Sequence, residues 1–148
     1  MSGTLRKERT SFSLSATGAS LYDSANVNAL TPDGSRSALP IRRPADRINF
    51  NGRLDHALNF SHTLRANVQS NGNDQRNLGV GGFELGERSF SRTSEDTLLR
   101  LSESGPRAKN VLGENRLQIR HQRSHSISDL EAPAVRVLDT FTIGGAQQ

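Results

Sequence analysis

The sequence predicts an all-β protein, an antiparallel up-and-down meander of about five or six strands that is part of a transmembrane β-barrel with long loops. Three observations carry this prediction. Several segments alternate apolar and polar residues, as strands with two different faces do. The connections between these segments are alternately long and short, which is typical of membrane barrels. Only 32% of the residues are hydrophobic and there is no Trp, so a large soluble core is not expected.

The composition excludes several classes of protein. There are no cysteines, which excludes disulfide frameworks and thiolate metal sites. The net charge is +4, but the arginines stand singly among Asp and Glu, which favours a patterned surface over a basic nucleic-acid-binding tail. No stretch approaches the ~18 apolar residues of a transmembrane helix. The polar first ten residues carry no secretory signal.

The first predicted barrel strand covers residues 10–22, where Phe12, Leu14 and Tyr22 share a face opposite a row of serines. After it, Pro32-Asp33-Gly34, Pro40 and Pro44 predict a long loop over residues 26–47, because Pro and Gly punctuate local structure. Residues 1–45 are therefore expected to form this strand and the loop.

Two further strands are predicted at residues 46–56 and 62–70, joined by a short turn. Ile48, Phe50 and Leu54 alternate with polar residues in the first of these strands, and Leu64 and Val68 do so in the second. The polar, glycine-rich residues 71–92 then predict a long loop, and loops of that length tend to be functional or mobile.

The remaining strands are predicted at residues 94–104, 111–122 and 134–142, so that residues 46–148 hold most of the barrel segment. A short helix over residues 97–104 is the alternative to the first of these strands, and Gly105-Pro106 would end it after about two turns. In residues 134–142 the alternation is weaker, because Val135, Val137 and Leu138 fall on both faces.

The two strand faces define the candidate site residues. The apolar face is interpreted as lipid-facing, the alternative being burial against a second sheet in a soluble sandwich. The polar face is interpreted as lumen-facing, the alternative being a solvated face with weak cross-strand ion pairs. The lipid-facing candidates are Ile48, Phe50, Leu54, Leu64, Val68, Leu99, Leu101, Leu117 and Ile119. The lumen-facing candidates are Arg53, Arg65, Arg100, Arg116 and Arg120.

The other motifs do not indicate a phosphate-binding, metal-binding or catalytic site. Gly79, Gly81, Gly82 and Phe83 lack the Gly-Lys-Ser/Thr ending of a phosphate loop and are interpreted as part of an outer loop. His121 and His125 suggest no third metal ligand, and no Ser, His and Asp have a spacing that implies catalysis. The protein is therefore expected not to be an enzyme and to use no cofactor or metal.

An ordered set of segments resembles the TonB-dependent receptors, and in particular the Oar-like branch, whose members carry a carboxypeptidase-regulatory-like domain. The set covers roughly two thirds of the chain. It consists of Ile48-Asn49-Phe50-Asn51-Gly52-Arg53-Leu54-Asp55-His56, His62-Thr63-Leu64-Arg65, Asn77-Leu78-Gly79-Val80-Gly81-Gly82-Phe83 with Glu87-Arg88, Leu99-Arg100-Leu101-Ser102-Glu103-Ser104-Gly105-Pro106, Asn115-Arg116-Leu117-Gln118, Val135-Arg136-Val137-Leu138-Asp139-Thr140-Phe141 and Gly144-Gly145-Ala146-Gln147-Gln148.

The resemblance implies a barrel fragment of a receptor that takes up a nutrient across the outer membrane. Its expected partners are outer-membrane lipid, a nutrient whose identity the sequence does not indicate, and the TonB system acting through a plug that this chain does not show; nucleic acid is not expected. Two rivals remain: a soluble antiparallel β-sheet module that binds a partner through its arginine-rich face, and a basic, largely disordered chain.

Overall fold

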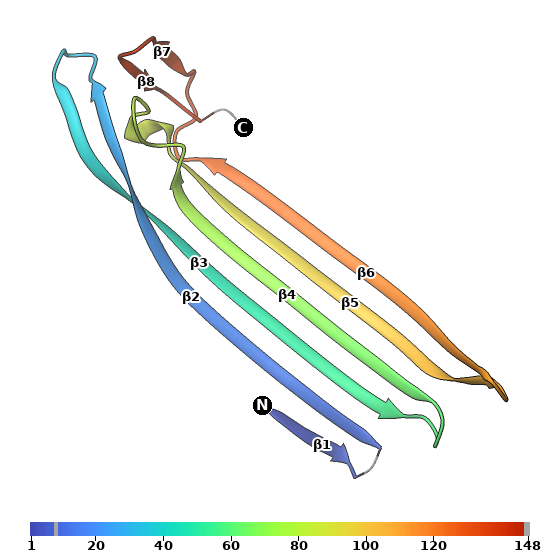
Figure 1. The fold of residues 1–148 in the computed structure, drawn as a ribbon. Coiled ribbons are helices and arrows are strands. Elements are labelled where there is room, and N and C mark those ends of the chain that lie inside the picture. Colours follow the sequence, from blue (N-terminus) through green and yellow to red (C-terminus); the bar gives the residue numbers. More distant parts are fainter. Residues whose placement is uncertain (8, 147–148) are drawn as a thin grey trace. The chain divides into compact units, whose positions relative to one another are not determined.

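A computed structural model describes residues 1–7 and 9–146. These residues form almost only β structure, with one turn of 3-10 helix (Figure 1). The elements are β1 (Ser2–Arg6), β2 (Thr10–Leu30), β3 (Arg36–Ala57), β4 (Thr63–Leu78), η1 (Gly86–Arg88), β5 (Phe90–Ala108), β6 (Val111–Ser128), β7 (Val135–Val137) and β8 (Phe141–Ile143).

One sheet holds six strands in the order of the chain, β1-β2-β3-β4-β5-β6, with each strand antiparallel to the next. The predicted all-β antiparallel meander is therefore confirmed. The alternative helix over residues 97–104 is wrong, because that segment lies inside β5. Five predicted strands lie largely or wholly within β2 to β6, although every one of these strands extends further than expected.

The long loop predicted over residues 26–47 is wrong. β2 runs to Leu30 and β3 begins at Arg36, so the connection consists of residues 31–35 alone. Pro40 is tolerated inside β3 because β4 ends at Leu78, and Asn77 bonds through its side chain to the carbonyl of Arg42. Pro40 therefore lies beyond the end of β4, where a missing N–H costs no ladder bond.

The glycine-rich loop predicted over residues 71–92 is also wrong in its bounds. Residues 71–78 belong to β4 and residues 90–92 to β5, which leaves residues 79–89 as the connection. Cross-strand polar contacts hold these parts of the strands, such as Arg76 with Asp46 and Arg92 with Ser126. Strands that are polar on both faces show no hydrophobic alternation, so this signal could not reveal them.

The single strand predicted over residues 134–142 is instead a small hairpin. β7 and β8 pair with each other as a separate two-stranded sheet, with Val137 opposite Phe141. Asp139 in the turn has a φ of 56°, a left-handed conformation that Asp tolerates. The apolar residues on both faces of this segment reflect the turn inside it.

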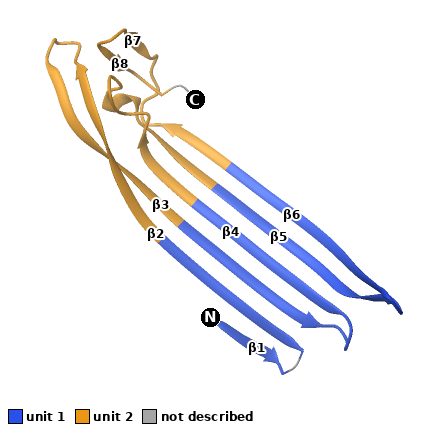
Figure 2. Ribbon diagram, viewed as in Figure 1, with its two compact units in different colours: residues 1–18, 48–72, 95–123 blue, residues 19–47, 73–94, 124–148 orange. Residues whose placement is uncertain are grey.

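The chain divides into two units, which are described separately (Figure 2). Unit 1 comprises residues 1–18, 48–72 and 95–123, and unit 2 comprises residues 19–47, 73–94 and 124–148. Every buried hydrophobic side chain of the described residues belongs to unit 2: Ala25, Val27, Ala29 and Val80. Unit 1 is a single layer of sheet, with β1 paired to residues 10–13 of β2 at one end of the strand order.

Within the described residues, no helix is long and apolar enough to cross a membrane.

Candidate functional site

One face of the unit 1 sheet carries the apolar side chains that alternation predicts. A methyl group added at Gly52 would lie 2.9 Å from Val68 Cγ1, 3.2 Å from Leu14 Cδ2 and 3.5 Å from Phe50 Cε1, so these side chains from β2, β3 and β4 share a face. Successive side chains of a strand point to opposite sides, which extends the face to the other strands. We call this set the apolar belt: Leu14, Ile48, Phe50, Leu54, Leu64, Val68, Leu99, Leu101, Leu117 and Ile119.

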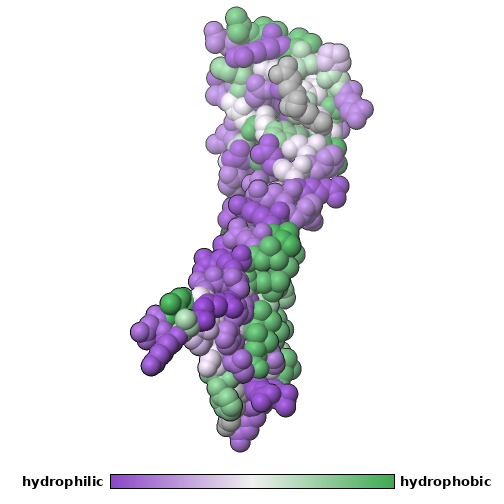
Figure 3. All heavy atoms as spheres, turned by 90° about the vertical axis from the view of Figure 1, so that its right-hand side faces the viewer, coloured by the Kyte–Doolittle hydropathy of each residue, from purple (hydrophilic) through white to green (hydrophobic). Residues whose placement is uncertain are grey.

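The apolar belt is open to its surroundings. Ile48 is 66% exposed and Ile119 is 54% exposed, and Leu64 and Leu101 are only half-buried. Figure 3 shows hydrophobic side chains gathered in a continuous area of the surface, bordered by hydrophilic ones. A soluble sandwich would seal these residues against a second sheet, and among the described residues of unit 1 no such layer covers them.

Polar groups border the belt on its own face. Toward the β3–β4 and β5–β6 turns, His62 Nδ1 lies 2.6 Å from Glu103 Oε1, and Asn115 donates to the same carboxylate at 3.1 Å. Toward the other ends of the strands, Ser70 Oγ and Thr97 Oγ1 lie 3.0 Å apart. The belt therefore has two polar limits along the strands. The alternation places Glu103 with Leu99 and Leu101 on this face.

The opposite face of unit 1 gathers most of the lumen-facing candidates. Arg53, Arg65, Arg100 and Arg116 come from the neighbouring strands β3, β4, β5 and β6 and line one hollow of about 460 Å³. We call it the arginine hollow. Its other lining residues, which the sequence did not single out as site residues, are Asn67, Ser102, Glu114 and Gln118.

Carboxylates pair with three of the four arginines. Asp55 accepts bonds from Arg53 Nε and Arg65 Nε, both at 2.7 Å, and Glu114 accepts one from Arg116 at 2.9 Å. The arginine side chains of these pairs are about half exposed or more, so each pair contributes little to stability. Arg120, the remaining candidate, makes two 2.9 Å bonds to Asp96 and does not line the hollow.

Arg100 differs from the other arginines of the hollow. Its Nε donates to the amide oxygen of Gln118 at 3.1 Å, and among the described residues no carboxylate pairs with it. The hollow and its immediate partners thus hold four guanidinium groups against the two carboxylates of Asp55 and Glu114. The excess positive charge lies on the polar face of the unit 1 sheet.

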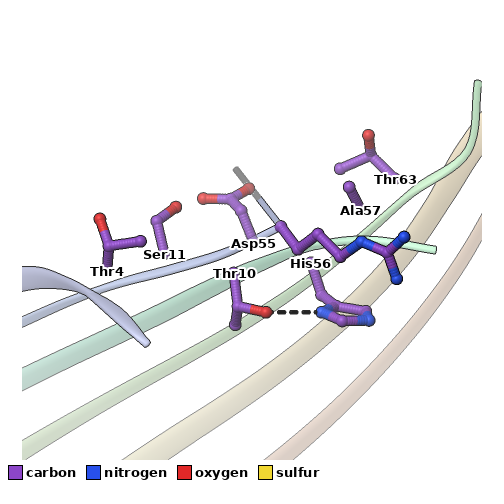
Figure 4. Close-up of a pocket in the computed structure, with 8 residues that line it drawn as sticks. Thr4, Thr10, Ser11, Asp55, His56, Ala57 and Thr63 are labelled. Carbon is purple, nitrogen blue, oxygen red and sulfur yellow. Dashed lines mark hydrogen bonds between the residues drawn. The ribbon is translucent and has the colours of Figure 1, made fainter. Parts of the chain in front are cut away.

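A smaller hollow of about 300 Å³ lies in unit 1, near the start of β2 and the end of β3 (Figure 4). Thr10 Oγ1 lies 2.8 Å from His56 Nδ1, whereas Asp55 and Ser11 point away from this pair. Neighbouring residues of a strand point to opposite faces of the sheet. Asp55 therefore lies on the face of the arginines, and His56 lies on the face of the apolar belt, at its border. The Asp55 carboxylate and the His56 imidazole are thus on opposite faces, whereas acid–base chemistry by this pair would need them side by side.

The predicted outer-loop residues lie in unit 2, where the connection between β4 and β5 is held by hydrogen bonds. Gly82 N donates to Asn26 O at 2.8 Å, and Asn28 N donates to Gly82 O at 2.7 Å, so Gly82 pairs with the edge of β2. A methyl group on Gly81 would lie 3.2 Å from Ala25 Cβ. Gly79, Gly81 and Gly82 all have positive φ values, and Phe83 is about half exposed.

Unit 2 also contains contacts that the sequence did not reveal, because Arg42 and Arg43 were assigned to a long loop. The guanidinium of Arg42 lies 3.9 Å from the centre of the Tyr22 ring, a cation–π contact. Arg43 bonds to Asp23 at 2.6 Å and 2.9 Å. These bonds hold the pKa of the Asp23 carboxyl below its usual value.

Among the described residues, no three His, Cys, Asp or Glu side chains are grouped so that they could hold a metal ion. Comparison of the chain with protein-family models, with curated proteins and with solved structures gives no match.

Proposed function

We propose that this chain forms part of the wall of an outer-membrane β-barrel of the TonB-dependent receptor type, which takes up a nutrient across the outer membrane. The single observation that carries the proposal is the exposed apolar belt on a single-layer sheet whose other face is polar. The TonB system would act through a plug supplied outside the described residues.

The belt supports lipid contact on energetic grounds. Burial of apolar surface is worth roughly 25 cal/mol per Å², and soluble monomers rarely expose large contiguous apolar patches. Along β3 the belt runs from Ile48 to Leu54, about 20 Å at ~3.3 Å per residue. That length is comparable with the ~25 Å apolar band of outer-membrane barrels.

Strand length and strand edges agree with the same proposal. β2 and β3 have 21 and 22 residues, whereas about 9–11 residues suffice to cross a bilayer, so both strands would extend well beyond the belt. β6 stands at the end of the strand order with 18 residues. A long strand edge needs a pairing partner, and closure into a barrel with further strands supplies one.

The proposal is tested by adjacent substitutions on opposite faces of β6. Ile119→Arg places a charge in the belt and is expected to weaken binding to detergent micelles by about 2–4 kcal/mol, the cost of Arg near the middle of a bilayer. Gln118→Arg, the matched control, adds the same charge to the polar face and is expected to leave micelle binding unchanged. Partitioning of the two purified variants is measured by equilibrium sedimentation, with circular dichroism to monitor the β structure.

Three outcomes would overturn the proposal. Equal micelle binding by both variants would show that the belt does not meet lipid. A wild-type chain that is β-structured and monomeric in plain buffer would favour a soluble module instead. A chain with no β signal in either medium and with strongly salt-dependent binding to nucleic acid would favour a basic disordered chain.

A further inference from the structure

We propose that the arginine hollow binds a doubly charged oxyanion, the phosphate group of a small solute. This inference rests on the proposed function and deepens it, because it names the chemistry of a solute that the polar face contacts. The hollow is the place where four neighbouring strands each direct an arginine into one space of about 460 Å³.

Charge balance favours a dianion. Arg53, Arg65, Arg100 and Arg116 carry four positive charges, and their carboxylate partners Asp55 and Glu114 carry two negative charges. The excess matches the charge of a phosphate monoester near neutral pH. A neutral ligand would leave this excess uncompensated, and a single carboxylate would compensate half of it.

The hydrogen-bond donors of the hollow are only partly used. A guanidinium has five N–H donors in a planar fork that matches the oxygens of a phosphate. In the bonds described, Arg65 commits Nε to Asp55, Arg100 commits Nε to Gln118, and Arg116 commits one terminal nitrogen to Glu114. The remaining donors of these three side chains are available to a ligand in the hollow.

Arg100 is the centre of the proposed site. Asp55 and Glu114 already compensate the other arginines, whereas the partner of Arg100 is the neutral amide of Gln118. An oxyanion beside Arg100 gains a charge-assisted bond without displacing a carboxylate. Loss of Arg100 should therefore weaken binding more than loss of any arginine that has its own acid.

The test is titration of the full chain with inorganic phosphate, with a sugar phosphate and with the same sugar unphosphorylated. It is followed by phosphorus NMR and by calorimetry at low salt, in whichever medium gives the β-type circular dichroism. The sugar phosphate is expected to bind and the free sugar is not. Inorganic phosphate that binds as well as the ester would identify the anion itself as the ligand, and weaker binding would identify the ester.

Arg100→Gln is expected to weaken phosphate binding at least tenfold, and Arg100→Lys less, because Lys keeps the charge but not the fork. Arg120→Gln is the matched control: it removes one charge from the same face of the sheet, outside the hollow, and should change binding less than twofold. Equal losses in both variants, or no binding by a wild-type chain that keeps its β signal, would overturn the inference. If Arg100→Gln loses its β signal, the phosphate binding of Arg100→Lys is compared with that of Arg120→Gln instead.

The outcomes separate this inference from the proposed function. Phosphate binding that fails while Ile119→Arg still weakens micelle binding overturns the hollow alone. Phosphate binding that persists while Ile119→Arg and Gln118→Arg bind micelles equally overturns the membrane proposal alone.

Discussion

Single residues shape the turn between β2 and β3. In the connection between β2 and β3, Gly34 has a φ of 81°, and Thr31 and Ser35 bond to the carboxylate of Asp33. The Thr31 hydroxyl, then the Ser35 backbone N–H and hydroxyl, lower the pKa of Asp33 to about 2. The Pro-Asp-Gly signal thus marks a tight turn, although the sequence placed it within a long loop.

The turn predicts a local pH dependence. A carboxyl whose folded pKa lies below its ordinary 3.8 stabilises the fold fully above that value, and this contribution is lost as the pH falls through about 2. The carbon-13 shift of the Asp33 carboxyl should therefore titrate near pH 2. Replacing Thr31 with Val and Ser35 with Ala should return the midpoint toward the ordinary value. A midpoint near 4 in the unchanged chain would contradict this account.

Any side chain at position 79 is expected to destabilise the fold. The φ of Gly79 is 79°, and a methyl group there would lie 2.9 Å from the carbonyl oxygen of Arg88. Gly79→Ala is expected to lower the free energy of unfolding by about 2–3 kcal/mol, from left-handed strain and from the clash. Gly86→Ala is the control, because its methyl group would meet Ile41 at an ordinary 3.7 Å. Denaturant unfolding followed by circular dichroism compares the two, and equal losses would count against the loop geometry.

At the scale of elements, the sequence predicted the strands that have one apolar face and missed the parts that have none. Ile48, Phe50 and Leu54 alternate with polar residues, so the middle of β3 was predictable from periodicity. The far part of β4 is held instead by Arg76 and Asn77, whose partners Asp46 and Arg42 are distant in sequence. Only the register of the folded sheet brings such pairs together.

The same limit applies to the candidate site. Alternation placed the arginines on one face, but it did not show that Arg53, Arg65, Arg100 and Arg116 share one hollow while Arg120 stands outside it. That distinction depends on how neighbouring strands are aligned, and this alignment is a tertiary property.

Arg88 is expected to hold the β7–β8 hairpin in place within unit 2. Its side chain is only 15% exposed, bonds to Glu84 at 2.9 Å and donates to the carbonyl oxygen of Gly145. Arg88→Ala removes charge-assisted bonds worth about 1–3 kcal/mol, so trypsin should cleave after Arg136 at least fivefold faster. Arg92→Ala is the control, because Arg92 bonds instead to Ser126 of β6. Equal cleavage in both variants would show that Arg88 does not retain the hairpin.

In the whole molecule, the apolar belt is proposed to meet lipid and the polar face to meet water. The chain has no cysteine, so single cysteines carrying a spin label can be introduced one at a time along a strand. Adjacent positions on opposite faces provide internal controls. The pairs are Ile48 and Asn49, Leu54 and Arg53, Leu101 and Ser102, and Ile119 and Gln118.

The most direct measurement is the accessibility of these labels to oxygen, which concentrates in lipid, and to a water-soluble nickel reagent, for the chain in lipid–detergent micelles. A belt that meets lipid predicts a period of two along each strand, with belt positions accessible to oxygen and their neighbours accessible to nickel. Belt positions shielded from both reagents in a compact monomer in plain buffer would contradict it.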